Sequence, residues 1–154
     1  SSASTDVYKR QALVTCHRDD AILSQSPNIS EFKDEWVDLQ REIDHYNTII
    51  EWDDMWDTET AKKWFKKGHR LFLFKQEDKI QGWVWVFTTK EFRHLYVNPQ
   101  YRNLKNAKDL LSTVGYIVSK DWAKWWAQID DWNLISWSVV KGIGWKKVID
   151  FHDN

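Results

Sequence analysis

The sequence predicts a single domain of the α/β (α+β) class, with helices on both faces of a mixed sheet. Three observations support this prediction. Helical and strand periodicities alternate along the chain, two neighbouring strands are apolar enough to be buried on both faces, and neither a repeat nor a Pro/Gly/Ser linker divides the 154 residues. A chain of this length fits one domain with a sizeable core.

The first part of the chain is expected to hold a strand and two helices. Residues 12–15 are predicted as the first strand. From Ser30 onward, apolar residues recur every three to four positions, which predicts an amphipathic helix with Ser30 as its N-cap. A second, short helix is expected after Asp57 or Thr58, either of which can cap it, and Gly68 ends it. The inward side chains of the longer helix are Phe32, Trp36, Leu39, Ile43 and Tyr46.

The middle of the chain is expected to form a hairpin, a further strand and a long helix. Residues 71–75 (LFLFK) and 80–87 (IQGWVWVF) flank the polar turn QEDK, and residues 92–97 (FRHLYV) form the next strand, which an Asn-Pro dipeptide ends. Residues 104–122 follow as a helix. Its inward residues are Leu104, Ala107, Leu110, Leu111, Val114, Ile117 and Val118.

The last part of the chain is expected to add two strands and a helix. Residues 125–130 (WWAQID) are predicted as a strand, and residues 133–141 as a short helix closed by Gly142 or Gly144. Residues 145–151 (WKKVIDF) are the last predicted strand. The whole order is therefore β, α, α, β, β, β, α, β, α, β.

Composition and charge exclude several classes of protein. The 22 basic and 23 acidic residues give a formal net charge of -1, which is not the footprint of a nucleic-acid binder. Cys16 is the only cysteine, and no Cys/His cluster has the spacing of a metal site. No apolar run is long enough to span a membrane, and no signal peptide is recognisable. We therefore expect a soluble cytoplasmic protein that binds no metal, nucleic acid or membrane.

The amino-terminal segment differs in character from the rest of the chain. Its sequence, SSASTDVYKRQ, has no periodicity, and the DVYKRQ part is similar to the translation of a transposon-end adapter used in sequencing libraries. We therefore expect residues 1–11 to be a non-native segment and assign the fold to residues 12–154.

Tryptophan is unusually frequent, with 12 residues between Trp36 and Trp145. Each one buries a large apolar surface while keeping one N–H donor, so most are expected in the core or at the rim of a pocket. The alternatives are a stacking platform for carbohydrates or nucleobases and an oligomer interface. The positions follow the periodicity of the elements rather than clustering, which favours the core.

Residues 95–107, LYVNPQYRNLKNA, lead from a strand through an Asn-Pro turn directly into a helix. Free N–H groups at a helix amino terminus form a ready site for anions, and the helix dipole favours negative charge there. The segment resembles the cofactor motif of the GNAT superfamily of acyl-CoA-dependent N-acetyltransferases, in which a loop Arg/Gln-x-x-Gly-x-Gly/Ala opens the helix. Arg102 and Ala107 match this pattern, whereas Lys105 stands in the place of the first loop glycine.

The resemblance implies a GNAT-like fold and a site for acetyl-CoA. The fold would be a mixed, largely antiparallel central sheet with helices on both faces, and residues 12–154 would form one N-acetyltransferase domain. The pantetheine arm would hydrogen-bond the strand edge at Leu95, Tyr96 and Val97. Lys105 is expected either to adopt ordinary helical angles or to impose a conformational cost there, and its position alone motivates the hypothesis that its ammonium compensates by meeting a phosphate. The pyrophosphate would bind the backbone N–H groups of Arg102, Asn103, Leu104, Lys105, Asn106 and Ala107.

A second match lies downstream, where Asn133, Ser136 and the run IGW at residues 143–145 fall in the register of another family motif. The resemblance therefore adds Asn133 to the cofactor-binding residues. Val140 stands where many family members carry a tyrosine that protonates the departing thiolate. Water, or a thiolate that leaves unassisted, would have to take that role.

Two side chains at the predicted strand of residues 92–97 are candidate catalytic bases: Glu91 directly precedes this strand, and His94 lies in it. Glu91 lies in the register of a glutamate used by the histone-acetylating branch of the family, and the alternative is a solvated loop charge. His94 is of a residue type that titrates near neutral pH, and it can face either the core or the solvent. By analogy with the family, a backbone N–H near Tyr96 or Val97 would stabilise the oxyanion.

Further acidic residues border the expected site. An acidic run lies where the family's first two helices flank the acceptor pocket, which would suit a cationic amine; the alternative is a solvated connector in which Asp57 caps a helix. Asp130 and Asp131 are expected to cap the helix that starts at Asn133. The acidic run consists of Glu51, Asp53, Asp54 and Asp57.

The sequence thus predicts an enzyme that transfers an acetyl group from acetyl-CoA directly to a primary amine, small or peptidic. Such a transfer needs a neutral amine, aligned reactants and a stabilised oxyanion. Two alternatives stay open: a catalytically inactive acyl-CoA-binding module and a Trp-rich structural protein that oligomerises. A homodimer is compatible with all three.

Overall fold

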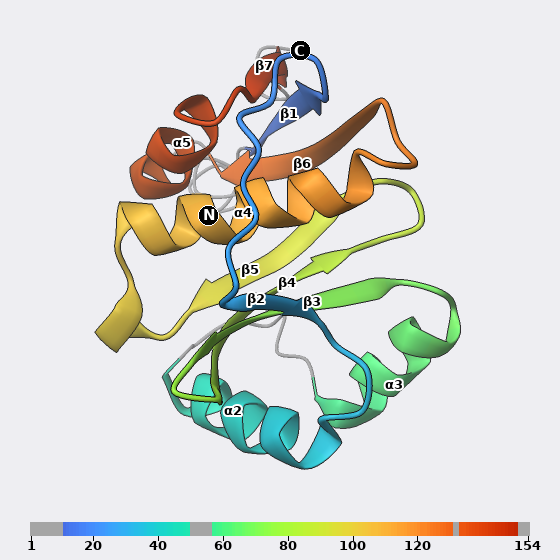
Figure 1. Cartoon of the computed structure of the whole chain (residues 1–154), viewed down its shortest axis with the longest axis vertical. Coiled ribbons are helices and arrows are strands. Elements are labelled where there is room, and N and C mark those ends of the chain that lie inside the picture. Colours follow the sequence, from blue (N-terminus) through green and yellow to red (C-terminus); the bar gives the residue numbers. More distant parts are fainter. Residues whose placement is uncertain (1–10, 50–56, 131–132, 151–154) are drawn as a thin grey trace, which may run out of the picture.

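The computed structural model describes residues 11–49, 57–130 and 133–150 (Figure 1). It has the predicted α/β (α+β) class, with one short strand and one 3-10 turn beyond the predicted elements. β1 begins at Gln11, the last residue of the segment predicted to be non-native. The elements are β1 (Gln11–His17), β2 (Ile29–Glu31), α2 (Trp36–Ile49), α3 (Thr58–Lys66), β3 (Arg70–Gln76), β4 (Lys79–Val86), β5 (Phe92–Val97), η1 (Pro99–Tyr101), α4 (Leu104–Val118), β6 (Lys124–Asp130), α5 (Leu134–Lys141) and β7 (Lys146–Asp150).

The strands form two antiparallel sheets (Figure 1). One sheet has the order β6-β1-β7, with β1 in the middle, and the other has the order β2-β3-β4-β5. The sheets meet at β5 and β6, where a parallel bridge joins Glu91 to Trp126. The combined sheet is therefore mixed and largely antiparallel, as predicted, and it opens between β5 and β6.

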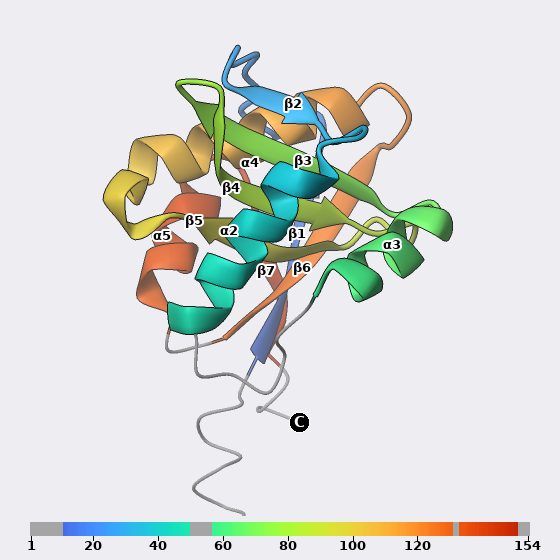
Figure 2. The same ribbon diagram turned by 90° about the horizontal axis from the view of Figure 1, so that it is seen from below.

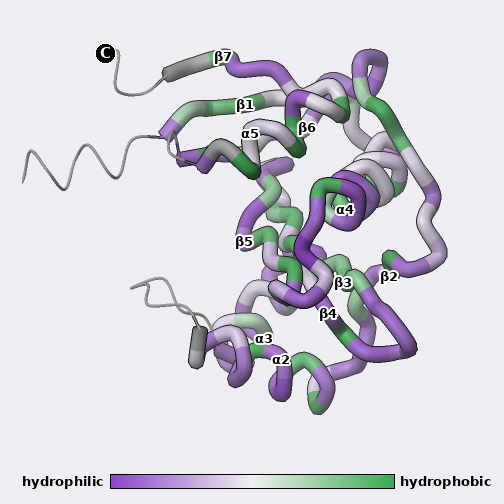
Figure 3. The backbone as a smooth tube through the Cα atoms, turned by 90° about the vertical axis from the view of Figure 1, so that its left-hand side faces the viewer, coloured by the Kyte–Doolittle hydropathy of each residue, from purple (hydrophilic) through white to green (hydrophobic). Residues whose placement is uncertain are grey.

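Alternate side chains on the strands of the larger sheet pack into two separate hydrophobic cores, one on each face. On β3, Phe72 and Phe74 belong to the core under α4, whereas Leu71 and Leu73 belong to the core under α2 and α3. α4 covers one face of this sheet and α2 and α3 cover the other, which confirms the predicted arrangement (Figures 1 and 2). Hydrophobic residues accordingly gather along the strands (Figure 3).

Tryptophans contribute to both cores. Trp83 and Trp85 of β4 are fully buried on the side of α2 and α3, and Trp125 and Trp145 are buried in the other core. The core interpretation is confirmed for these residues. Partly buried tryptophans that pack against the two cores are Trp36, Trp64, Trp122 and Trp137.

The residues around Ser30 form strand β2 and not the start of a helix. β2 pairs antiparallel with β3, and the Arg70 guanidinium donates to both carboxylate oxygens of Glu31 at 2.7 and 2.8 Å. The predicted N-cap at Ser30 is therefore wrong, because the strand ladder and this ion pair outweigh the helical periodicity. α2 begins only at Trp36.

Helix α4 differs from the prediction at both ends. It ends at Val118 and not at Trp122, whose N–H donates to the Val118 carbonyl in a turn. Leu104 was predicted to face inward, but it is 47% exposed because the hydrophobic cluster under α4 begins only at Ala107. The other predicted inward residues of this helix are buried or partly buried.

Candidate functional site

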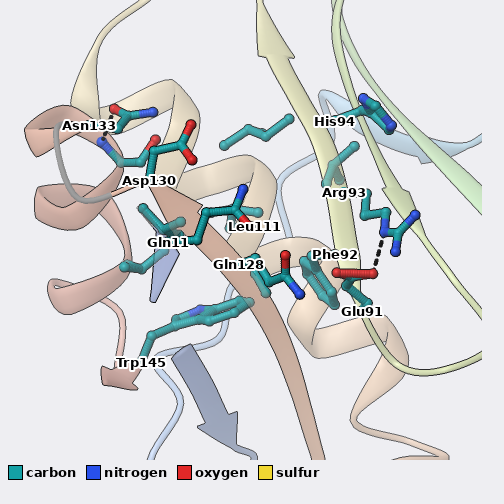
Figure 4. Close-up of a pocket in the computed structure, with 16 residues that line it drawn as sticks. Gln11, Glu91, Phe92, Arg93, His94, Leu111, Gln128, Asp130, Asn133 and Trp145 are labelled. Atoms are coloured by element: carbon teal, nitrogen blue, oxygen red, sulfur yellow. Dashed lines mark hydrogen bonds and ion pairs between the residues drawn. The ribbon is translucent and has the colours of Figure 1, made fainter. Parts of the chain in front are cut away.

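The opening between β5 and β6 contains a cavity of about 370 Å³ (Figure 4). The strand segment 91–95 lines one wall, and residues 127–130 of β6 line the opposite wall. Leu111 of α4 and Val140 of α5 also line it. The cavity therefore lies where the two sheets separate and where β5 presents a largely unpaired edge within the described part of the chain.

A bulge at His94 interrupts the alternation of side chains along β5, so that two neighbouring side chains lie on the same face of the sheet. The pairing of β5 with β4 shifts between Trp83 and Trp85, because β5 has one residue more than β4 there. His94 has a φ of 55°, a left-handed conformation that is uncommon for a residue other than glycine. As a result, the neighbours Arg93 and His94 both project toward the α3 side of the sheet, where His94 stacks on Trp64 and Arg93 lies over Phe87.

Glu91 is buried and ion-paired, so the alternative of a solvated loop charge is wrong. Its side chain is 4% exposed, and its carboxylate accepts a hydrogen bond from Nε of Arg93. A carboxylate removed from water in this way needs a cationic partner. Glu91 also lines the cavity, so its carboxylate belongs to the candidate site. Its role as a base stays a prediction.

His94 lies half-buried against helix α3. Its imidazole stacks on the Trp64 ring, with the ring centroids 5.3 Å apart and an interplanar angle of 23°. Trp64 in turn packs edge-on against Trp85 at 5.1 Å. The imidazole is therefore held at the α3 border of the cavity, and its catalytic role also stays a prediction.

The strand-edge residues predicted to bind the pantetheine arm face different directions. Leu95 is 38% exposed and lines the cavity. The Tyr96 ring packs on Trp83 and Tyr46 instead, with centroid distances of 4.6 and 4.9 Å. Burial raises the pKa of the Tyr96 phenol above its ordinary value. Its side chain is therefore a core group on the α2 side of the sheet.

Val97 presents its backbone to the open edge of β5. The Asn98 N–H donates across to the Gln81 carbonyl of β4, so strand alternation directs the N–H and C=O of Val97 away from β4. Arg102 occupies that carbonyl with two hydrogen bonds of 2.9 and 3.0 Å. The Val97 N–H is left as the edge donor at this point, which makes Val97 rather than Tyr96 the better candidate for the predicted oxyanion donor.

Half of the six N–H groups predicted to bind the pyrophosphate are used within the chain. The N-cap residue Asn103 accepts two of them, one with its side chain at 2.8 Å and one with its backbone carbonyl at 3.2 Å. The occupied groups are those of Arg102, Asn106 and Ala107. In the described part of the chain, the groups without a partner are those of Asn103, Leu104 and Lys105. The start of α4 therefore keeps three free donors.

Lys105 occupies the second position of α4 in an ordinary helical conformation and is exposed. The missing glycine of the family motif is thus accommodated without a left-handed residue. Its ammonium group lies in the first turn, near the positive end of the helix dipole, where anions bind favourably. Whether it meets a phosphate stays a prediction.

Helix α5 brings polar and apolar groups to the opposite end of the cavity (Figure 4). Asn133 caps this helix itself, because its Oδ1 accepts from the Ser136 N–H at 3.0 Å, so the predicted cap by Asp130 is wrong. The amide nitrogen of Asn133 is left to serve a ligand. Val140 lines the cavity at the position of the family's tyrosine, and Ser136 lines it one helical turn earlier.

The acidic run is described only at its last residue. Asp57 caps α3, with its Oδ1 accepting from the Thr60 N–H at 2.8 Å. This backbone hydrogen bond lowers the pKa of the Asp57 carboxyl. The capping alternative is therefore confirmed for Asp57. Glu51, Asp53 and Asp54, like Asp131, lie outside the described residues.

The described residues are informative on three further features: a reactive thiol, a metal site and a membrane-spanning helix. The Cys16 thiol is buried, and burial raises its pKa to about 11, so it is a poor nucleophile. No group of three His, Cys, Asp or Glu side chains lies close enough to hold a metal ion in this part of the chain. The described helices also include none with the length and apolar character needed to cross a membrane.

Arg93 is the site residue that sequence reasoning missed. It stands two residues after Glu91, so period-two alternation places both on one face, and a pairing was predictable. The bulge that brings His94 to the same face had no signal in the sequence, because it arises from the register with β4.

The fold is that of GNAT acetyltransferases, to which several of the chain's structural neighbours belong. An acetyltransferase of the GNAT family from Colwellia psychrerythraea superposes with a TM-score of 0.72 at 13% identity, over 90% of this chain and 53% of its own. A GCN5-related N-acetyltransferase from Kribbella flavida gives 0.56 at 10% identity, over 90% and 55%. One from Sphaerobacter thermophilus gives 0.56 at 11% identity, over 96% and 54%.

These likenesses concern the fold alone. The chain spans about half the length of each of these three neighbours. No protein-family model matches the sequence, and no curated protein is similar to it.

Proposed function

We propose that the chain is an N-acetyltransferase that moves an acetyl group from acetyl-CoA directly to a primary amine. The observation that carries the proposal is the cavity between β5 and β6, because it brings an unpaired strand edge and the buried carboxylate of Glu91 to one opening. The GNAT fold supports the same function.

The groups present fit acetyl-CoA, which supplies an activated acetyl thioester when bound. Three free N–H groups and the dipole at the start of α4 suit a pyrophosphate. The Val97 N–H suits a carbonyl oxygen on which negative charge develops. Asn133 and Leu95 would contact the ligand at the opposite walls of the cavity.

The reaction needs two proton transfers and one exchange of bonds. The amine loses a proton, its nitrogen bonds to the acetyl carbon as the carbon–sulfur bond breaks, and the thiolate takes a proton, which leaves the N-acetyl amine and the CoA thiol. Glu91 and His94 are the two bases at the α3 border of the cavity. The Ser136 hydroxyl or water would supply the second proton, since Val140 has none.

Thermal unfolding with acetyl-CoA, CoA and longer acyl-CoAs tests the binding step. A ligand at 100 times its Kd stabilises the native state by about 2.7 kcal/mol, so acetyl-CoA is expected to raise the unfolding temperature by several degrees. Adenosine diphosphate serves as a control for the pyrophosphate alone. The absence of a shift with every acyl-CoA would overturn the proposal.

A second candidate function is binding of acyl-CoA without turnover. The observations that favour it are Val140 at the tyrosine position and the ion pair that holds Glu91 to Arg93. Release of the CoA thiol, followed across a panel of primary amines, separates the two functions. We expect amine-dependent thiol release, whereas a thermal shift without release from any amine would establish the binding module.

A further inference from the structure

The guanidinium of Arg93 is fixed in place but keeps two free donor groups. Its Nε donates to Glu91, and its plane lies over the Phe87 ring at 4.6 Å. The side chain is nevertheless 47% exposed, and it lines the cavity. Its two terminal nitrogens have no hydrogen-bond partner in the described part of the chain. A rigid fork of this kind matches the two oxygens of a carboxylate.

A second hollow continues from the cavity along the outer face of β1 and β6. This β1–β6 groove has a volume of about 510 Å³, and it meets the cavity at Gln128, which lines both. Leu13 and Trp126 give it an apolar floor. The groove therefore offers space for the body of an acceptor that reaches the cavity from the α3 side.

The charge of the β1–β6 groove is positive. Lys90 and Lys124 line it, and no Asp or Glu does so among the described residues. Of the two acidic residues that line the cavity, Glu91 is already paired, and Asp130 lies at the far end, beside Asn133 (Figure 4). An anionic group would therefore be attracted to the Arg93 end, and a second ammonium group would be repelled from it.

We propose that the acceptor is a primary amine that also carries a carboxylate, an amino acid with an apolar side chain, whose carboxylate binds the free fork of Arg93. The apolar side chain lies in the β1–β6 groove, and the amine enters the cavity beside Glu91 and His94. This inference rests on the proposed acetyl transfer and names its substrate class.

A set of acceptors that differ in one group tests the inference without altering the protein. Initial rates with saturating acetyl-CoA are compared for phenylalanine, phenylalaninamide and phenethylamine, at a pH above the pKa values of all three amines, so that protonation does not decide the result. We expect kcat/KM to be at least about 10-fold higher for phenylalanine, as the loss of one charge-assisted hydrogen-bond pair predicts. Equal or higher values for the neutral acceptors would overturn this inference alone.

Failure of the acetyl-transfer proposal itself would give a different result in the same thiol-release measurement. If none of the three acceptors, nor any amine of a wider panel, releases thiol, then the acetyl-transfer proposal falls, and the substrate class falls with it. Turnover of neutral amines only would leave acetyl transfer standing.

Arg93→Lys locates the carboxylate. Lysine keeps a positive charge for Glu91 but lacks the planar fork, so KM for phenylalanine is expected to rise about 10-fold more than KM for phenylalaninamide, and the acetyl-CoA thermal shift checks that the cofactor site is intact. An equal rise for both acceptors would assign Arg93 a structural role and overturn the contact. Arg41→Lys is the matched control, because Arg41 forms an exposed ion pair with Asp38 on α2, at 3.6 Å.

Discussion

His94 combines a left-handed backbone with a side chain at the border of the cavity. A left-handed conformation costs a non-glycine residue about 1 to 2 kcal/mol, and such strain persists where the surrounding structure enforces it. Here the register shift against β4 and the stack on Trp64 enforce it. The strained backbone at His94 thus places the Arg93 side chain and the imidazole on the same face of the sheet, at a local cost in conformational energy.

Replacement of His94 by glycine and by alanine separates its backbone from its side chain. Glycine adopts the left-handed conformation without strain, so His94→Gly is expected to be more stable than His94→Ala by about 1 kcal/mol in urea unfolding. Both variants lack the imidazole, and we expect both to lower kcat at least about 100-fold if His94 moves the proton of the amine. A glycine variant with unchanged kcat would instead assign proton removal to Glu91.

Lys105 tests the anion site at the start of α4. Lys105→Ala removes an exposed charge beside the free N–H groups, and we expect it to weaken acetyl-CoA binding several-fold at low salt and little at high salt. Lys105→Gly is expected to bind no better and to lose about 1 kcal/mol of stability, because the position is helical. Affinities are measured by titration calorimetry, with Lys66→Ala on α3 as the control. If alanine or glycine binds as tightly as lysine at low salt, the phosphate contact is ruled out.

At the scale of elements, Glu35 ties the start of α2 to the larger sheet. Its carboxylate accepts from the N–H groups of Lys33 and Asp34 at 3.0 and 3.2 Å, and it lies 3.4 Å from Nζ of Lys75 on β3. Burial raises the pKa of Glu35, but the two backbone donors and Lys75 outweigh burial, so the pKa lies below its ordinary value of 4.5. The ionised form therefore stabilises the junction between β2 and α2.

This pKa predicts the pH dependence of a variant. A carboxyl group whose folded pKa is lowered stabilises the protein above its unfolded pKa, and the contribution is lost as the pH falls through the folded pKa. Glu35→Gln is therefore expected to cost about 1 kcal/mol at pH 7, and the difference from the natural chain should vanish below the folded pKa. Urea unfolding at several pH values measures it. Glu77→Gln, in the exposed turn after β3, should show no comparable loss; a loss at Glu35 that is independent of pH would contradict the assignment.

The elements that the sequence predicted well are those whose signal is local. The hairpin of β3 and β4, the strand β5 and the helix α5 follow from apolar runs and caps within a few residues of the true ends. β2 was missed, because its strand form depends on pairing with β3 and on the ion pair of Glu31 with Arg70. The bulge at His94 depends in the same way on β4. Both features that the sequence did not predict, β2 and the bulge at His94, therefore depend on pairing between strands that are distant in sequence.

At the scale of the whole molecule, the two sheets are held together at the closed end of the opening. The Trp126 N–H donates to the Lys90 carbonyl at 3.0 Å, and its indole Nε1 donates to the Thr89 carbonyl at 2.9 Å. Both acceptors belong to the turn between β4 and β5. Beyond this point β5 and β6 diverge around the cavity, so the geometry of the candidate site depends on how firmly the turn holds β6.

Trp126→Phe tests whether this junction sets the geometry of the site. Phenylalanine keeps an aromatic ring but loses the indole donor, and we expect a loss of about 1 kcal/mol in urea unfolding because the Thr89 carbonyl loses its partner. If the junction positions β5 against β6, the Kd for acetyl-CoA rises several-fold as well, since a site displaced by even a small distance loses its alignment with the ligand. Trp137→Phe is the matched control: Trp137 is also partly buried, and no hydrogen bond from its indole exists within the described residues. If the Kd for acetyl-CoA rises no more in Trp126→Phe than in Trp137→Phe, then the opening keeps its shape without the Trp126 donor. In that case the packing of α4 against both sheets is sufficient to hold it.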